Sequence, residues 1–210
     1  MTGRFITIEG QDGAGKSTNL EVIKHRLEHA GISVRVTREP GGTKLGEALR
    51  DLLLKDKDKV IGNMAELLLM FAARAQHLQE VIEPTLKQGH WILCDRFTDA
   101  SYAYQGGGRD MDNQVITTLE QLVQGQRRPD LTVLLDLPVQ LSADRADARS
   151  APDRFEVQAQ QFKERVREAY LGLAEQHAER IQVVDASRSL SEVNQSVANL
   201  IDDYIEQEND

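Results

Sequence analysis

Residues 9–18 of this chain read EGQDGAGKST, which combines three glycines with a lysine and two hydroxyl side chains. An apolar run, FITI at residues 5–8, comes directly before them and predicts a strand that leads into this loop. The spacing is the complete Walker A pattern, Gly10-x-x-x-x-Gly15-Lys16-Ser17. The backbone amides of such a loop point at phosphate oxygens, the lysine reaches the β- and γ-phosphates, and the hydroxyl suits Mg²⁺. We therefore predict that the chain binds ATP or GTP.

The predicted nucleotide-binding residues are Gly10, Gln11, Asp12, Gly13, Ala14, Gly15, Lys16, Ser17 and Thr18. The alternative is an ordinary glycine-rich turn, which the complete motif between a strand and a helix makes the weaker interpretation. GTPases carry a guanine-specifying Asn-Lys-x-Asp after a later strand, and no such tetrapeptide occurs here. The loop alone does not identify the group that receives the phosphate.

The bulk composition limits the class of protein. The chain has 210 residues, of which 40% are apolar and 28% charged, as expected for one soluble globular domain. Its net charge of −9 argues against a broad nucleic-acid surface, and no apolar run approaches the length of a membrane span. A single cysteine, Cys94, fits a reducing cytoplasm. We therefore expect a cytoplasmic protein of one domain, residues 1–210, without nucleic-acid or membrane partners.

Short apolar runs alternate with helical patterns along the chain. Five strands are predicted, at residues 4–9, 32–37, 91–95, 131–136 and 181–185. Their nearly continuous apolar character is typical of parallel strands that are covered on both faces. Helical patterns include residues 112–125, 153–177 and 189–206. We predict an α/β fold with three layers, α/β/α, around a five-stranded parallel sheet, which is the fold of P-loop nucleoside triphosphatases.

Four further segments carry polar or basic side chains where a ligand is expected. They are TREPGGT (37–43), FAAR (71–74), DRFTDASYAYQG (95–106) and RADARSAPDRF (145–155). Three of them follow predicted strands, and open α/β sheets bind ligands at the C-terminal ends of their strands. Seventeen of the 25 basic residues are arginines, whose planar guanidinium groups match pairs of phosphate oxygens. These features favour phosphoryl transfer to a small acceptor.

In combination, the segments resemble those of the thymidylate kinases. The resemblance covers nearly the whole chain in order, and TREPGGT together with DRF-x-x-x-S-x-A-Y-Q is specific when a Walker loop precedes both. It implies transfer of the γ-phosphoryl group of ATP to dTMP, which forms ADP and dTDP for dTTP synthesis and uses Mg²⁺. It also implies a homodimer, for which a helix such as residues 64–80 could supply the surface.

Two positions on one helical face have competing interpretations. By resemblance, Phe71 stacks on the thymine ring, and an aromatic face is a suitable platform for a base. Periodicity instead places Phe71 in the core between Leu67 and Leu78. Arg74 lies on the same face and needs a polar partner there, which is either a thymine carbonyl or a carboxylate in a buried ion pair.

The resemblance implies the other dTMP contacts as well. Ser101 and Gln105 are expected to hydrogen-bond the base, and Tyr104 to close against C2′ of the sugar, with helix packing or surface exposure as the alternative. Asp12 is expected to face the 3′-hydroxyl of dTMP, because a carboxylate in a phosphate loop would otherwise be repelled by the triphosphate. The residues expected near the acceptor phosphate are Arg38, Arg50 and Arg96, and Pro40, also counted with the dTMP site, would fix the path of the TREPGGT loop.

Catalysis is expected to depend on four residues, Lys16, Asp95, Arg96 and Arg149. Asp95 would orient either Arg96 or Mg²⁺-bound water, and Ser17 and Asp95 form the predicted metal site. Thymidylate kinases place a catalytic arginine either in the P-loop or in a mobile lid. Gly13 occupies the P-loop position here, so the lid type is implied, with a lid at about residues 144–154. Arg149 is the first choice, Arg145 is expected to contact ATP, and Arg154 is a third candidate. The alternative is a solvated loop.

Two other functions stay open. The first is a kinase for another nucleoside monophosphate or for a deoxynucleoside, although Arg38, Arg50 and Arg96 favour an acceptor that already carries a phosphate. The second is a non-catalytic nucleotide switch, which would hydrolyse ATP slowly, need no acceptor and bind a partner protein in a nucleotide-dependent way.

Overall fold

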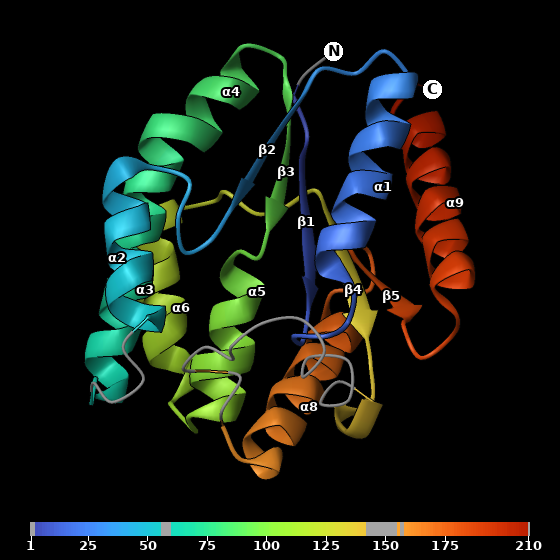
Figure 1. Cartoon of the computed structure of the whole chain (residues 1–210). Helices are drawn as coiled ribbons and strands as arrows, with labels where there is room; N and C mark the ends of the chain where they lie inside the picture. The colour runs from blue at the N-terminus through green and yellow to red at the C-terminus, as the bar shows by residue number, and fades with distance from the viewer. Residues whose placement is uncertain (1–2, 56–59, 142–154, 156–157, 210) are drawn as a thin grey trace.

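A parallel sheet forms the centre of the molecule, as Figure 1 shows for the computed structural model, which describes residues 3–55, 60–141, 155 and 158–209. The strands lie in the order β2-β3-β1-β4-β5, and every neighbouring pair is parallel. They are β1 (Phe5–Gly10), β2 (Val34–Arg38), β3 (Trp91–Asp95), β4 (Leu131–Asp136) and β5 (Ile181–Asp185). The predicted α/β class and five-stranded parallel sheet are confirmed.

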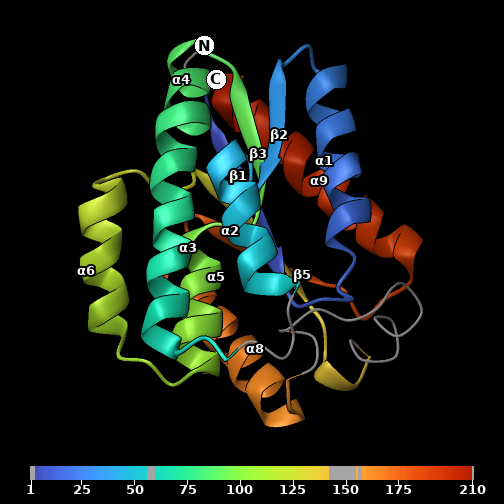
Figure 2. The same ribbon diagram turned by 60° about the vertical axis from the view of Figure 1, so that its left-hand side comes forward.

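Helices cover both faces of the sheet and form the outer layers (Figures 1 and 2). One face carries α1 (Lys16–His29) and α9 (Leu190–Asn209), which pack side by side. The other carries α5 (Thr98–Ser101) and α8 (Gln160–Gln176), together with the helical rod that begins with α3 (Asn63–His77). The remaining helical segments are α2 (Lys44–Leu54), η1 (Leu78–Ile82), α4 (Glu83–Lys87), η2 (Tyr102–Gly108) and α6 (Asn113–Gln124). Of these, η1 and η2 are π-helical.

The central strand β1 sends alternate side chains to the two faces. Ile6 and Ile8 pack with the apolar stripe of α1, whereas Phe5 packs with η1 and with Phe97 on the opposite side. Side chains of a strand alternate, so Glu9 lies on the same side as Phe5. A charged side chain is therefore directed into the layer that contains α5 and α8, and it becomes part of the site described below.

The edge strand β2 departs from the sequence prediction. It begins at Val34 and ends at Arg38, later than the predicted residues 32–37, and it is not covered on both faces. Val36 is 38% exposed, because an edge strand has a neighbour on one side alone. Of the predicted helix at residues 153–177, the structure describes α8 and, before it, Phe155 and Gln158–Ala159. Among the described helices, none is both long enough and apolar enough to cross a membrane.

Candidate active site

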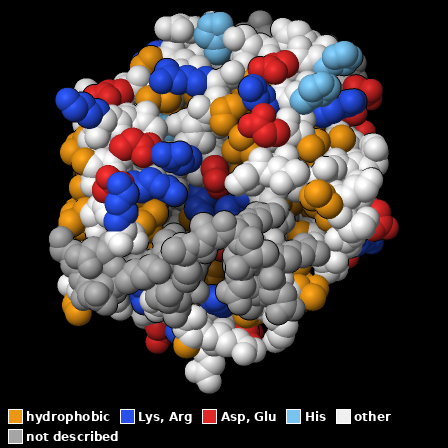
Figure 3. All heavy atoms as spheres, in the orientation of Figure 1, with side chains coloured by type: hydrophobic (Ala, Val, Ile, Leu, Met, Phe, Trp, Pro, Cys, Tyr) orange, Lys and Arg blue, Asp and Glu red, His pale blue; other side chains and the backbone are white. Residues whose placement is uncertain are grey.

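The site lies at the C-terminal ends of β1 and β3, where two predicted segments meet. After β1 the chain forms β2 and β3 on one side of β1, and then β4 and β5 on the other side. The strand order therefore reverses at β1, which is the switch point of the sheet. The glycine-rich loop follows β1, and Asp95 and Arg96 follow β3. Both contribute to a cavity of about 240 Å³. Lys and Arg side chains gather on this face of the molecule (Figure 3).

Glycine is required at two points of the loop between β1 and α1. Gly15 has φ +90°, a conformation that side chains with a Cβ rarely adopt. At Gly10 a Cβ would lie 2.5 Å from the carbonyl oxygen of Leu135 on the neighbouring strand. The loop can therefore fold close to β4 and enter α1 at Lys16, whose helix directs its N-terminal amides toward the cavity.

Lys16 is buried beneath this loop. Its ammonium donates hydrogen bonds to the backbone oxygens of Gly10 at 3.1 Å and Gln11 at 2.9 Å, and it lies 3.3 Å from Asp12 Oδ1. Burial lowers the pKa of Lys16, the charge of Arg96 lowers it further, and Asp12 opposes both. The loop thus holds one cation in place with its own backbone.

Asp12 and Arg96 join the phosphate loop to the end of β3. Arg96 Nη2 donates to Asp12 Oδ1 at 2.9 Å, and the guanidinium lies 4.9 Å from the centroid of the Tyr104 ring. Although burial raises it, the charges of Lys16 and Arg96 bring the pKa of the Asp12 carboxyl well below its usual value. Asp12 is therefore ionised at neutral pH and connects the two cations of the site.

Arg96 adopts a backbone conformation that is costly for a residue with a side chain. Its φ is +70°, and the only other described residue besides glycine with a positive φ is Asp110. Two hydrogen bonds from consecutive amides hold the turn: Arg96 N–H donates to the Ile8 oxygen at 3.1 Å, and Phe97 N–H donates to Glu9 Oε1 at 2.7 Å. Such strain persists when its surroundings enforce it, and it is frequent at functional sites.

Glu9 supports the same arginine through a second contact. Tyr170 of α8 donates to Glu9 Oε2 at 2.7 Å, and Arg96 Nη1 donates to the Tyr170 hydroxyl at 3.2 Å. Burial raises the pKa of Glu9 to about 7, and the positive charge of Arg96 limits the rise, while the carboxyl of Asp99 adds to it. The Glu9 carboxyl therefore titrates near neutrality, close to Arg96.

Glu9→Gln is expected to change how stability depends on pH. The pKa of Glu9 is about 7 in the folded chain, above its ordinary value of 4.5, so the folded state keeps a proton that the unfolded state releases between these values. The wild type therefore loses stability as the pH rises from about 4.5 to about 7, by ~3 kcal/mol relative to Glu9→Gln. Urea unfolding of both proteins at pH 5 and pH 8 measures this. Parallel changes in the two would contradict the raised pKa.

The far end of the cavity is organised by Arg74. Its Nε donates to Glu39 Oε2 at 2.8 Å, and its Nη2 donates to the backbone oxygen of Phe97 and to Ser101 Oγ, both at 3.1 Å. Its Nη1 is buried and makes no hydrogen bond to any part of the chain that the structure describes. One donor of a buried, oriented guanidinium is thus unused beside the cavity that Arg74 lines.

Phe71 and its neighbour Met70 are placed differently from the stacking prediction. Phe71 is 2% exposed, packs with Leu67 and Ile116, and does not line the cavity. Its ring lies 4.6 Å from the guanidinium carbon of Arg74. Met70 does line the cavity. Of the two alternatives that the sequence raised for Phe71, this arrangement corresponds to core packing, and direct stacking on thymine stays a prediction without support from the cavity.

Most of the predicted site residues come together around this cavity. Those that line it are Asp12, Gly13, Gly15, Lys16, Ser17, Pro40, Arg50, Arg74, Asp95, Arg96, Ser101, Tyr104 and Gln105. The remaining loop residues, Gly10, Gln11, Ala14 and Thr18, shape the loop without lining the cavity. Arg38 pairs with Glu47 at 2.8 Å and borders a neighbouring groove that also includes Ser17 and Asp95. The predicted lid, with Arg145, Arg149 and Arg154, lies outside the described residues.

Ser17 and Asp95 fit the predicted magnesium site. Both line the cavity beside Lys16, and Asp95 Oδ1 is a buried carboxylate oxygen without a hydrogen-bond partner within the described ranges. Oxygen ligands of this kind suit Mg²⁺, which usually keeps several waters and binds through one or two protein oxygens and the phosphates. The donor set is therefore appropriate for a metal that arrives with a nucleotide.

Two residues that line the cavity, Glu39 and Met70, were not predicted from the sequence. Glu39 lies within the TREPGGT segment, yet it received no role; the structure shows it as the buried partner of Arg74. The segment did contain a signal, because a carboxylate after a strand and an arginine on an apolar helix face both need partners. Met70 gave no such signal. The adjacent Phe71 is aromatic, so the sequence favoured Phe71 as the residue that contacts the base.

Fold and site together place the chain in the P-loop class of nucleotide-binding proteins. The family model of thymidylate kinase matches residues 8–197. Thymidylate kinases of Pseudomonas fluorescens (strain Pf0-1) and Ectopseudomonas mendocina (strain ymp) are 53% and 52% identical over 206 residues, which is 98% of this chain and of each relative. A crystal structure of thymidylate kinase from Ehrlichia chaffeensis superposes with a TM-score of 0.76 at 32% identity, over 96% of this chain and 99% of that one. The chain belongs to the thymidylate kinase family.

Proposed function

We propose that this chain transfers the γ-phosphoryl group of ATP to dTMP and forms ADP and dTDP. The observation that carries the proposal is one cavity with Lys16 of the phosphate loop at one end, Arg74 with an unused donor at the other, and Arg96 between them. This order of charges matches a bound nucleoside monophosphate whose phosphate lies near ATP at the phosphate loop and whose base lies near Arg74. Membership of the thymidylate kinase family supports the same substrates.

No protein nucleophile is required, because an oxygen of the dTMP phosphate attacks the γ-phosphorus in line. The protein contributes position and positive charge, which stabilise the charge that develops in the transition state. Lys16 would act on the donor phosphates, and Arg96, Arg50 and Arg38 on the acceptor phosphate. Ser17 and Asp95 would hold Mg²⁺, which would supply positive charge to the phosphates. A lid arginine, with Arg149 as first choice, remains part of the proposal.

The sugar and base would be recognised by the other residues that line the cavity. Asp12 is proposed to accept from the 3′-hydroxyl, since its carboxylate is ionised and already bridges both cations. Tyr104 is proposed to close against C2′. Arg74 would donate from Nη1 to a base carbonyl, and Ser101 and Gln105 would complete the polar contacts.

A coupled ADP-release assay tests this function across dTMP, dUMP, dCMP, dGMP and thymidine. Strong preference for dTMP is the expected result. Equal turnover of dCMP would favour a kinase for other nucleoside monophosphates, and turnover of thymidine would favour a deoxynucleoside kinase. ADP release that does not depend on any acceptor would favour the nucleotide switch. Omission of Mg²⁺ is expected to abolish turnover.

Met70→Ala and Phe71→Ala are expected to have separable effects. Met70 lines the cavity and is half-buried, so its truncation should raise KM for dTMP several-fold with little change in the Tm. Phe71 is a core residue, and its truncation should lower the free energy of unfolding by about 3–5 kcal/mol. Steady-state kinetics and thermal unfolding of both variants check this. A stable Phe71→Ala protein with weakened dTMP binding would restore the stacking role.

We also propose that the chain, as a single domain, forms a homodimer through α3. This helix lies between α2 and α6, and its outer face presents Ala65, Leu68, Ala72 and Ala75 (Figure 2). Leu68 is 49% exposed, and small residues around it permit close approach of a second copy. A reducing cytoplasm is the proposed location, which the buried free thiol of Cys94 supports.

Leu68→Arg is expected to convert the dimer to a monomer, because it would place a charge at the centre of the proposed apolar contact. Leu190→Arg is the matched control, since Leu190 is also exposed but begins α9 on the opposite side of the sheet. Sedimentation velocity measures both variants. A dimeric Leu68→Arg protein would place the interface elsewhere.

A further inference from the structure

Gln105 is the only side-chain amide among the described residues that line the cavity. Gln105 lines the cavity from the π-helical turn η2 and is 1% exposed. One side of its amide donates hydrogen bonds and the other accepts them. A rotation of 180° would exchange the amide oxygen and nitrogen with almost no change in shape. A neighbouring group must therefore fix which of the two atoms faces the ligand.

Glu66 supplies that constraint from the first turn of α3. Its carboxylate is fully buried, and its Oε1 accepts a hydrogen bond from Gln105 Nε2 at 2.9 Å. An ionised carboxylate accepts but does not donate, so it stabilises the amide with its nitrogen toward Glu66. The oxygen of the amide is then directed away from Glu66. This is a buried, charge-assisted contact, which is stronger than a neutral one.

Arg109 pairs with Glu66, and a cation beside a carboxylate favours the ionised form, which only accepts hydrogen bonds. Its Nη2 lies 3.3 Å from Glu66 Oε2, and its Nε lies 3.4 Å from Glu66 Oε1. Arg109 is itself held by Gln158 at 3.0 Å and lies 4.9 Å from the centroid of the Phe162 ring. Neither Glu66 nor Arg109 lines the cavity. Glu66 is thus outside the reach of a ligand there and would act only through Gln105.

We propose that Glu66 is a positioning residue that selects the pyrimidine base by locking the Gln105 amide with its oxygen toward the ligand. The inference rests on the proposed function. Thymine and uracil present an N–H at ring position 3 and a carbonyl at position 4, which match the Gln105 oxygen and the unused Nη1 donor of Arg74. Cytosine presents a ring nitrogen acceptor and an amino donor at these positions. Both of its contacts would be mismatched, and a site built on buried hydrogen bonds rejects such an analogue strongly.

Glu66→Gln tests the proposal, because a neutral amide can donate or accept and would no longer dictate the orientation of Gln105. The ratio of kcat/KM for dTMP to that for dCMP is expected to fall by about tenfold or more, with KM for ATP unchanged. Glu66→Asp, which still only accepts, should keep most of the ratio. An unchanged ratio in a folded Glu66→Gln protein would overturn the proposal.

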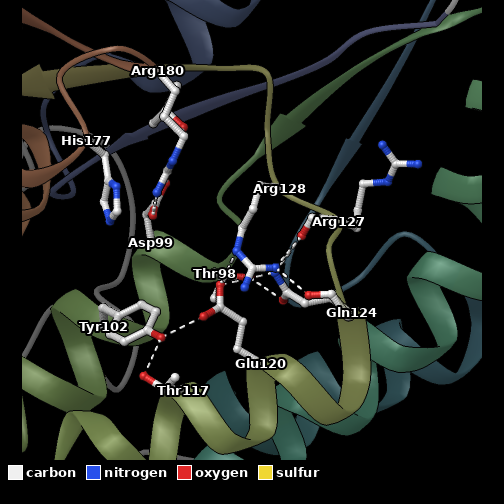
Figure 4. Close-up of polar contacts among 12 residues, drawn as sticks. Thr98, Asp99, Tyr102, Thr117, Glu120, Gln124, Arg127, Arg128, His177 and Arg180 are labelled. Carbon is white, nitrogen blue, oxygen red and sulfur yellow. Dashed lines mark hydrogen bonds and ion pairs between the residues drawn. The ribbon is translucent and has the colours of Figure 1, made fainter.

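Glu120→Gln is the matched control (Figure 4). Glu120 is also a buried carboxylate on a helix; it accepts from Tyr102 at 2.7 Å and pairs with Arg128 at 2.8 Å, but neither it nor these partners line the cavity. The same chemical change is expected to lower Tm there and to leave the dTMP to dCMP ratio at the wild-type value. A ratio that falls equally in Glu120→Gln would mean that general destabilisation, not orientation, sets the effect.

Gln105→Leu keeps the proposal testable if Glu66→Gln does not fold. Leucine has neither donor nor acceptor, so the ratio should fall in this variant, and adding Glu66→Gln to it should have no further effect on the ratio. A wild-type ratio in Gln105→Leu would overturn the proposal. The wild-type protein distinguishes failure of the proposed function from failure of the Glu66 proposal. If the wild type does not prefer dTMP to dCMP, the proposed function is wrong. If the wild type prefers dTMP strongly and Glu66→Gln and Gln105→Leu keep that preference, only the role of Glu66 is refuted.

Discussion

Arg96→Met is expected to lower kcat/KM for dTMP by about 10³-fold, because it removes a preoriented cation from the centre of the cavity. The guanidinium is held on three sides, by Asp12 at 2.9 Å, by the Tyr170 hydroxyl at 3.2 Å and by the Tyr104 ring. None of these contacts must reorganise during the reaction, which is why the loss should be larger than that of an exposed charge. Arg96→Lys should restore little, since one ammonium cannot reach Asp12 and Tyr170 together.

Two further variants separate catalysis from folding at this position. Arg96→Gly removes the same charge but suits the φ of +70°, so it should be as inactive as Arg96→Met while its backbone strain is relieved. Arg26→Met is the matched control, because Arg26 also pairs with a carboxylate, Asp202, but does so between α1 and α9 outside the cavity. Steady-state kinetics and thermal unfolding measure all of them. Near-normal turnover by a folded Arg96→Gly protein would contradict the central role of Arg96.

Lys16→Met is expected to lower kcat by about 10³-fold. The lysine is the only basic side chain of the phosphate loop, and the loop carbonyls of Gly10 and Gln11 hold its ammonium where donor phosphates would lie. Its removal also takes a positive partner from Asp12, whose negative charge would then be less well balanced beside the phosphates. The effect should therefore appear in kcat as well as in the affinity for ATP.

The control for Lys16 lies on the same helix. Lys24→Met removes an equal charge two turns farther along α1, where the side chain is not part of the cavity, and should keep wild-type kinetics. The stabilisation of the protein by ATP and Mg²⁺, measured as a shift in Tm, should shrink in Lys16→Met and not in Lys24→Met. A full shift in Lys16→Met, together with normal kcat, would exclude the assigned role.

The phosphate loop was readable from the sequence because its function depends on consecutive residues. Glycines, lysine and serine within residues 10–17 act through local backbone geometry, so the motif contains most of the site that it builds. The strands were readable for a related reason: covering both faces of a parallel sheet requires nearly continuous apolar runs. The bounds of the edge strand β2 were predicted less well than those of β5, the other edge strand, which lies at the predicted residues 181–185.

The base end was harder to predict, because a difference of one position along a helix decides which side chain meets the ligand. Met70 and Phe71 are separated by about 100° around α3, and both belong to an apolar stripe in the sequence. Hydrophobic periodicity identifies such a stripe, but it does not show which residues of the stripe border a cavity. The packing of α3 against its neighbours places Phe71 inward and leaves Met70 beside the ligand space.

Sequence alone was sufficient for the class of fold, the triphosphate cradle and the family, since each of these is carried by local motifs or by burial patterns. The supporting acids needed the folded chain. Glu9 meets Tyr170, Glu39 meets Arg74, and Glu66 meets Gln105, in each case across a long stretch of sequence. Buried charges must find partners wherever the fold brings them, and that requirement has no fixed spacing. The orientation of the proposed catalytic and recognition groups is therefore a property of three-dimensional packing, whereas the sequence already named most of the residues that line the cavity.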